Sequence, residues 1–157
     1  MRQAMATYRE NIVSEPIPNS FAKNEAGEML RRNIFMMDGT IVPGAPYVAA
    51  TWYGPDTPVQ EPHTHEFDEY LSFIGTDPEH PEDLGCKATL LLGDEWVTIE
   101  KSCVIFIPAG VKHTVFKNTD MRRPYISVTG LMTNSAYVKT ENGVEKKMGK
   151  DGSIKAD

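Results

Sequence analysis

The stretch PHTHEFDEY at positions 62–70 decides the fold class, because it sets two histidines and a glutamate at spacings of two and four. On an α-helix, residues two apart point about 200° from each other, so His63 and His65 could not share one ion. On a β-strand, residues two apart project from the same face, separated by about 6.6 Å. Glu69 has the same parity as both histidines. The stretch therefore predicts extended chain that presents three metal ligands on one face.

A further ligand has to come from another part of the chain, since one strand cannot surround an ion. His113 is the candidate, because it follows the rigid turn Pro108-Ala109-Gly110 between two apolar runs. Antiparallel pairing could bring this point opposite His65. Three neutral imidazoles and one carboxylate suit divalent Fe, Mn, Ni, Co or Zn and leave coordination positions open. We therefore expect one divalent transition metal ion, held by His63, His65, Glu69 and His113.

Short apolar runs rich in β-branched and aromatic residues follow residue 47, and turn dipeptides separate them. This pattern is typical of an antiparallel all-β barrel or sandwich, and the 3.6-residue period of amphipathic helices is largely absent. We predict a tight hairpin at Gly93-Asp94. The predicted strands cover residues 47–53, 66–74, 86–92, 95–99, 102–107, 113–117 and 125–131.

The segments on either side of the strand-rich part differ from it in composition. We expect residues 1–45 to form an irregular N-terminal arm, 46–138 the barrel, and 139–157 a flexible polar tail poor in large apolar residues. Within the arm, Asn24 to Arg32 are predicted to form a short helix, with acidic residues near its start. An acidic, proline-containing loop at 76–85 separates two predicted strands.

The composition excludes some classes of partner. The chain has 157 residues, 40% hydrophobic and 24% charged, which indicates a single globular domain. Its net charge of −6 repels phosphate backbones and anionic lipids, so we expect a small-molecule substrate and neither nucleic acid nor membrane as partner. No apolar stretch of signal-peptide or membrane-spanning length is present, so we expect a cytoplasmic protein. Because exposed barrel edges tend to be paired or covered, a homodimer is also expected.

Several other residues have a plain structural interpretation. Cys86 and Cys103 lie in apolar runs, which favours two buried thiols over a disulfide. His80 lies in the acidic loop without a partner at strand spacing, so we expect a solvated side chain. Arg31 and Arg32 are candidates for a substrate carboxylate, but the favoured alternative is that they complement the dipole of the predicted helix. The aromatic residues expected in the core are Trp52, Phe67, Phe73, Phe106 and Phe116.

The two histidine segments resemble the paired motifs of the cupin superfamily, in particular its small single-domain metal-binding members. The residues that match the first motif are His63, His65, Glu69 and Gly75, and those that match the second are Pro108, Gly110, His113 and Asn118. Ser102 stands where the family usually has the glycine that opens the second motif. The resemblance covers about residues 47 to 131. It implies a double-stranded β-helix, or jelly-roll, barrel with the metal inside.

The resemblance leaves the reaction open, since a fold alone does not fix a function. Cupins with this ligand set include dioxygenases, isomerases, decarboxylases and lyases. We therefore expect a metal-dependent enzyme that acts on a small organic substrate, with Glu69 as the candidate catalytic residue, either ligated throughout or released to act as a base. The alternative is a non-catalytic binding or sensing module, in which the ion is structural or orients a ligand.

Overall fold

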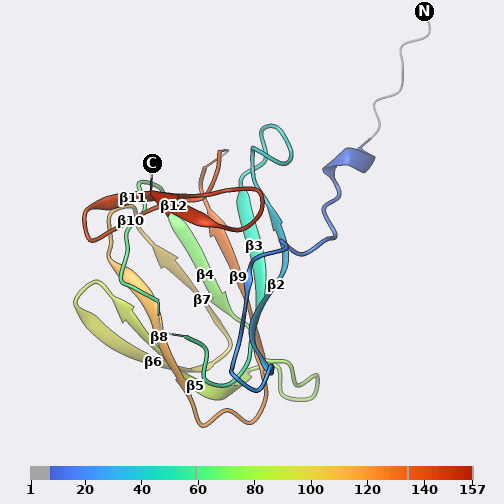
Figure 1. Cartoon of the computed structure of the whole chain (residues 1–157). Coiled ribbons are helices and arrows are strands. Elements are labelled where there is room, and N and C mark those ends of the chain that lie inside the picture. The colour runs from blue at the N-terminus through green and yellow to red at the C-terminus, as the bar shows by residue number, and fades with distance from the viewer. Residues whose placement is uncertain (1–7, 59, 134, 157) are drawn as a thin grey trace, which may run out of the picture.

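The computed structural model describes residues 8–58, 60–133 and 135–156, with the side chains of residues 115 and 116 excepted. Within these ranges the chain is almost entirely β-structure (Figure 1). No helix of the described residues has the length and apolar character needed to cross a membrane. The elements are a 3-10 helix η1 (Arg9–Asn11) and the strands β1 (Phe21–Lys23), β2 (Met29–Met37), β3 (Tyr47–Tyr53), β4 (Glu69–Phe73), β5 (Asp83–Leu92), β6 (Glu95–Lys101), β7 (Cys103–Ile107), β8 (His113–Thr119), β9 (Tyr125–Leu131), β10 (Val138–Glu141), β11 (Val144–Met148) and β12 (Ile154–Ala156).

The described strands form three antiparallel sheets. The largest has six strands in the order β1-β2-β3-β9-β4-β7, and the second has three in the order β6-β5-β8. These two sheets face each other and enclose a core, which is the arrangement of a jelly-roll barrel. The third sheet, β10-β11-β12, lies at one end of the barrel (Figure 1, red). The predicted all-β barrel is therefore confirmed.

The predicted central strands agree closely with the structure. Strands β3 and β9 coincide with the predicted ranges, and they pair along their whole length from Tyr47↔Leu131 to Tyr53↔Tyr125. The hairpin between β5 and β6 turns at Gly93, whose φ of 64° is a conformation that glycine adopts without strain. The remaining predicted strands begin or end a few residues away from the observed ones.

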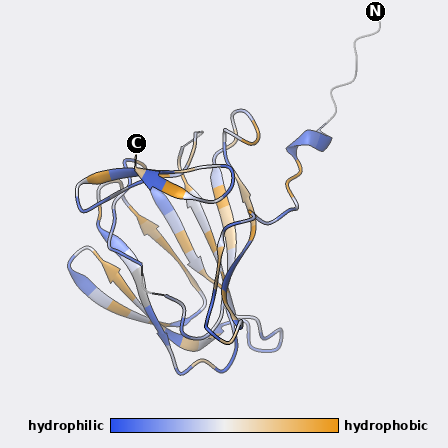
Figure 2. Ribbon diagram, in the orientation of Figure 1, coloured by the Kyte–Doolittle hydropathy of each residue, from blue (hydrophilic) through white to orange (hydrophobic). Residues whose placement is uncertain are grey.

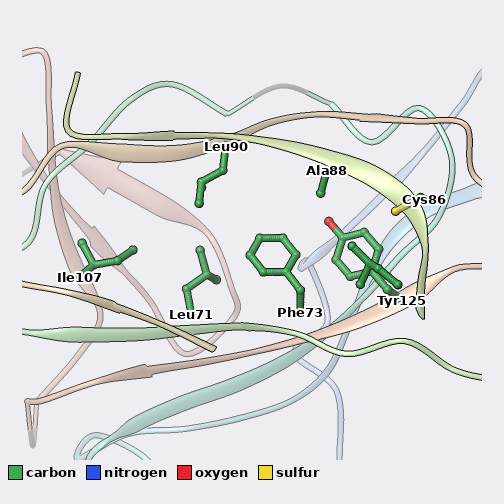
Figure 3. Close-up of a cluster of buried hydrophobic side chains, with 8 residues drawn as sticks. Leu71, Phe73, Cys86, Ala88, Leu90, Ile107 and Tyr125 are labelled. Carbon is green, nitrogen blue, oxygen red and sulfur yellow. The ribbon is translucent and has the colours of Figure 1, made fainter. Parts of the chain in front are cut away.

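The main core lies between the two larger sheets. Phe73 of β4 and Tyr125 of β9 are fully buried and face Ala88 and Leu90 of β5, which are also fully buried (Figure 3). Hydrophobic residues concentrate on the strands, whereas the connecting loops are largely hydrophilic (Figure 2). Removal of this apolar surface from water, at about 25 cal/mol per Å², is the main source of stability.

Two of the aromatic residues expected in the core are exposed, and that prediction is wrong. Phe106 is 51% exposed because it lies on the outer face of β7, where its ring contacts Tyr70 at a centroid distance of 5.5 Å. Phe67 is 42% exposed because residues 66 and 67 form a bend outside any strand. Trp52 is half-buried, and the side chain of Phe116 lies outside the described part of the chain.

The predicted helix over residues 24–32 is wrong, because these residues form a hairpin. Asn24 accepts a hydrogen bond from the backbone of Glu28 through its side-chain oxygen, 2.9 Å, so it closes the turn between β1 and β2. Gly27, with φ at 83°, supplies the left-handed residue of this turn. Strand β2 then pairs with β3, so the predicted irregular arm contributes two strands to the largest sheet.

The C-terminal segment is folded, so the prediction of a flexible polar tail is also wrong. Asn142 and Gly143 both have positive φ and form the tight turn between β10 and β11. The segment is anchored to the barrel by a bridge between Thr64 and Thr140. Met148 packs in a second apolar cluster with Ile17, Met36, Tyr47, Ala49 and Leu131. The proposed division of the chain at residues 45 and 138 stays a prediction, as does the homodimer.

The loop residues and cysteines agree with expectation. His80 is solvated, with 66% of its side chain exposed, and its imidazole lies 3.7 Å from Glu82. Cys86 is buried, Cys103 is partly buried, and both are free thiols. Ser102, which replaces a motif glycine, accepts a hydrogen bond from the backbone of Gly75 and donates one to the carbonyl of Pro81, so it ties the end of β4 to the acidic loop.

Replacing one core and one surface phenylalanine with alanine tests whether the two positions differ in their contribution to stability. We expect Phe73→Ala to lower the free energy of unfolding by about 3–5 kcal/mol, because it opens a cavity at a fully buried site. Phe106→Ala, at the exposed position, is expected to cost less than about 1 kcal/mol. Denaturant titration followed by circular dichroism measures both. Equal losses in the two variants would contradict the assignment of inner and outer faces.

Candidate metal centre

The four predicted ligands come together at the start of two strands. Glu69 opens β4 and His113 opens β8, while His63 and His65 lie in the segment that leads into β4. His63 and His113 form an isolated antiparallel bridge with reciprocal backbone hydrogen bonds of 3.1 and 3.0 Å. This bridge explains why a histidine so distant in sequence reaches the pair. All four side chains are buried, with 2–6% of each residue exposed.

The ligand atoms converge on one point. The three histidines each offer a ring nitrogen, and these atoms lie within 4.8 Å of one another. The Oε2 atom of Glu69 lies 3.0 Å from Nε2 of His65 and 2.9 Å from Nε2 of His113. The imidazole ring of His63 packs edge to face against those of His65 and His113, while the rings of His65 and His113 are tilted, with centroids 4.5 to 5.2 Å apart.

Backbone carbonyls determine which nitrogen of each histidine faces inward. The Nδ1 atoms of His63, His65 and His113 lie 2.7 to 3.1 Å from the carbonyl oxygens of Glu61, Val138 and Val111. A carbonyl oxygen can only accept, so each Nδ1 has to carry the proton and donate it. Each neutral ring therefore presents the lone pair of Nε2, which is the arrangement that supports a metal-binding histidine.

The inner atoms of this cluster have no hydrogen-bond partner of acceptable geometry. Nε2 of His65, Nε2 of His113 and Oε2 of Glu69 are all shielded from solvent and unsatisfied. With Nδ1 protonated and the rings neutral, all three atoms are acceptors, so their short separations are favourable only if positive charge lies between them, either as a proton on one ring or as a metal ion. A divalent ion would supply that charge, and the donor set of three imidazoles and one carboxylate suits it. The residues present therefore fit a metal ion.

The ionisation of the cluster follows from burial and mutual contact. Burial and the neighbouring His113 lower the pKa of His63 to about 3, which keeps this ring neutral at physiological pH. Burial opposes ionisation of Glu69, but its contacts with His113 and His65 outweigh burial and hold the pKa of Glu69 at about 2. Burial also disfavours a charged His113, yet Glu69 raises the pKa of His113 above its ordinary value.

The regular strand predicted through the first motif is interrupted. His63, His65 and Glu69 do face inward as their parity predicts, but Phe67 shares that parity and is exposed. The carbonyl of His65 accepts a hydrogen bond from the backbone of Gly110 at 2.8 Å, which holds the chain against the turn before β8. The chain then bends before it re-enters the sheet at Glu69, so the even spacing is preserved across an irregular segment.

A cavity of ≈ 250 Å³ adjoins the centre, and His63, Glu69 and His113 form part of its wall. The cavity lies between the main core, which contributes Leu71, and the second apolar cluster, which contributes Tyr47. Both termini help to enclose it. The side chains from the terminal segments are those of Ile17, Ser20, Tyr137, Lys139, Met148 and Ile154.

Polar wall residues that the sequence reasoning missed include three tyrosines. Tyr47 and Tyr53 come from β3, and Tyr137 precedes β10. Burial is the main cause that raises the pKa of each phenol, so all three remain protonated. Residues 47, 49, 51 and 53 all line the cavity, because alternate residues of a strand face the same side. This alternation was the sequence signal that could have placed Tyr47 and Tyr53 on the cavity wall. No comparable signal marked Tyr137, because it follows the last predicted strand, which ends at residue 131.

Comparison with known proteins identifies the fold. No family model matches the chain, and no curated protein matches it by sequence. One similar solved structure is a sugar phosphate isomerase of the cupin superfamily from Silicibacter pomeroyi. The alignment covers 82% of this chain and 77% of the isomerase, with a TM-score of 0.53 and 15% identity. The chain has the cupin fold.

Two further cupin-like matches cover similar parts of the chain. A protein of Acidithiobacillus ferrooxidans with a proposed sugar phosphate isomerase activity matches 80% of this chain over 76% of its own, with a TM-score of 0.50 and 13% identity. Oxalate decarboxylase of Lactobacillus farciminis matches 78% of this chain with a TM-score of 0.52 and 16% identity. The alignment covers only 33% of the decarboxylase.

Removal of one histidine tests the candidate metal centre directly. We expect His63→Ala to weaken Co²⁺ or Zn²⁺ binding by more than about 100-fold, because loss of a contact that only orients a ligand already costs about 10- to 100-fold. Calorimetric titration measures the affinity, and the visible spectrum of bound Co²⁺ reports the ligand set. The control is His80→Ala, which removes a solvated histidine and should leave both unchanged. Equal affinities in the two variants would contradict the assignment.

Proposed function

We propose that this chain is a metal-dependent enzyme that acts on a small organic substrate bound in the cavity beside the metal centre. One observation carries the proposal. The buried cluster of His63, His65, Glu69 and His113 opens onto a cavity of ≈ 250 Å³, lined by hydroxyl, amide and charged groups. A purely structural metal site is closed on all sides by its ligands, whereas a catalytic one keeps a position for water or substrate.

The ion would be held by the three histidines, with Glu69 as the fourth ligand. When bound, it would supply positive charge that polarises a substrate oxygen or activates dioxygen. The expected ion is a single divalent Fe, Mn, Ni, Co or Zn, since all of these accept imidazole and carboxylate ligands.

The chain's own residues would position the substrate. The phenol groups of Tyr47, Tyr53 and Tyr137 stay protonated, so they can donate hydrogen bonds to substrate oxygens. Ile17 and Met148 give the cavity apolar walls that exclude water. Glu69 is the group proposed to take a proton from the substrate if it leaves the ion during turnover.

The reaction class remains part of the proposal. The matched structures include a sugar phosphate isomerase and an oxalate decarboxylase, so chemistry on small oxygen-rich molecules is common to the named activities. Isomerase, lyase and decarboxylase reactions need the ion only as a charge, and a dioxygenase reaction needs an oxygen-binding metal. The choice therefore depends on which metal supports turnover.

The test loads the purified protein with each candidate metal and measures turnover. Oxygen uptake with catechols, thiols and diketones tests the dioxygenase class, and product analysis with small sugars and organic acids tests the others. We expect activity with at least one metal and none in His63→Ala. Tight metal binding without turnover of any substrate would instead indicate the non-catalytic binding or sensing module.

A conservative change at Glu69 tests its proposed double role. Glu69→Gln keeps the shape of the side chain but removes its charge and basicity. We expect weaker metal retention, and in metal-saturated protein a fall in kcat of about 100-fold, which is typical for loss of a general base. Metal analysis and steady-state kinetics measure the two effects separately. Full metal occupancy together with full turnover would rule out both roles.

A further inference from the structure

Arg31 places a cation on the wall of the cavity. It lies on β2 directly opposite Tyr53 of β3, and both residues line the cavity together with Asn33, Thr51 and Gln60. The alternative role of Arg31, as a complement to a helix dipole, no longer applies because residues 29–37 form a strand. The position of Arg31 therefore needs another explanation.

The guanidinium of Arg31 has no acidic partner among the described residues. Its Nε atom is shielded from solvent and makes no hydrogen bond within them. The arginines at the acidic loop differ, since Arg122 and Arg123 both pair with Asp83 at 2.8 and 2.9 Å. Leaving the buried N–H donor of a charged group without an acceptor costs free energy, which indicates that a bound ligand supplies the acceptor.

A second cation, Lys139, also lines the cavity, and its side chain is only 11% exposed. Lys139 pairs with Glu141 at 2.6 Å, but the same carboxylate also pairs with Lys146. One negative charge is thus shared by two positive ones. The excess positive charge adds to that of Arg31, whereas Glu61, which also borders the cavity, is exposed to solvent.

We infer that Arg31 binds the carboxylate of a small organic acid, and that this acid is the substrate class of the site. The inference rests on the proposed function. A planar guanidinium matches a carboxylate with two parallel hydrogen bonds, and the neighbouring hydroxyl groups of Tyr53 and Thr51 suit the remaining oxygen atoms. The cavity of ≈ 250 Å³ has the volume of about eight water molecules, so the acid has only a few carbon atoms.

Charge balance supports an anion over a neutral substrate. A divalent ion with Glu69 as its charged ligand would leave positive charge at one part of the cavity, and Arg31 adds more. Buried charge without a counter-charge is strongly unfavourable. An anionic substrate would compensate both, with its carboxylate at Arg31 and another oxygen directed to the centre.

The experiment measures ligand binding to the metal-free protein, so that its outcome does not depend on activity. Acetate, lactate, malonate, succinate and malate are titrated by calorimetry, together with neutral succinamide and inorganic phosphate. We expect at least one of the acids to bind, and succinamide not to bind. In Arg31→Gln the affinity for that acid is expected to fall at least about tenfold, and Arg31→Lys should recover part of it, because lysine keeps the charge but not the planar pair of donors.

The matched control is Arg32→Gln. Arg32 is the next residue, but its side chain is exposed and lies over the ring of Phe21 at 5.7 Å, so its loss should leave acid binding unchanged. Circular dichroism melting verifies that each variant is folded. The inference is overturned if no acid binds, if Arg31→Gln and Arg32→Gln bind the acid equally, or if phosphate binds and no carboxylate does.

The two proposals can fail separately. Acid binding that depends on Arg31, without turnover by any metal-loaded form, would contradict the enzyme and leave the organic-acid site intact. Turnover of a neutral substrate with no effect of Arg31→Gln on its KM would contradict the organic-acid site and leave the enzyme intact.

Discussion

Two backbone hydrogen bonds between His63 and His113 hold together the parts of the chain on which the site depends. They join the segment before β4 to the start of β8, and so link the two larger sheets at the site. The bridge brings the fourth ligand to the other three and sets one wall of the cavity. Because backbone groups make the bridge, the ligand side chains are free to turn inward, with each Nδ1 anchored on a carbonyl and each Nε2 directed to the shared point.

Much of the barrel and of the metal centre could be predicted from local sequence. Strands β3 and β9 follow from their β-branched and aromatic residues, and the inward side of His63, His65 and Glu69 follows from parity. Parity failed for Phe67, because it assumes a regular strand and the chain bends there. The position of His113 could be proposed only from a turn and a family resemblance, since the pairing that brings it to the centre links residues far apart in sequence.

The terminal segments were predicted poorly for a different physical reason. Strand β2 forms because β3 of the barrel offers it a partner, and local composition does not reveal such tertiary pairing. Strands β10, β11 and β12 pair with one another, and the bridge between Thr64 and Thr140 connects them to the barrel. Strand β2 carries a short polar run, in which Arg31 and Asn33 line the cavity while Arg32 is exposed. The Asn142-Gly143 dipeptide is a strong hairpin signal that the prediction of a flexible tail did not include, because that prediction followed from the scarcity of large apolar residues. The terminal segments supply four polar residues of the cavity wall, which are Ser20, Arg31, Asn33 and Lys139.

The carbonyl of Val138 has a consequence for how this protein can be handled. It accepts the Nδ1 proton of His65 at 2.7 Å, and the neighbouring Thr140 pairs with Thr64. A shortened version of the chain, cut at residue 138 to remove a segment that looks dispensable, would lose the Thr140 pairing and leave this carbonyl on a loose end. The imidazole of His65 would then be free to rotate or change tautomer. The last twenty residues therefore belong to any fragment made for biochemical work, and a fusion partner is better attached beyond them through a spacer.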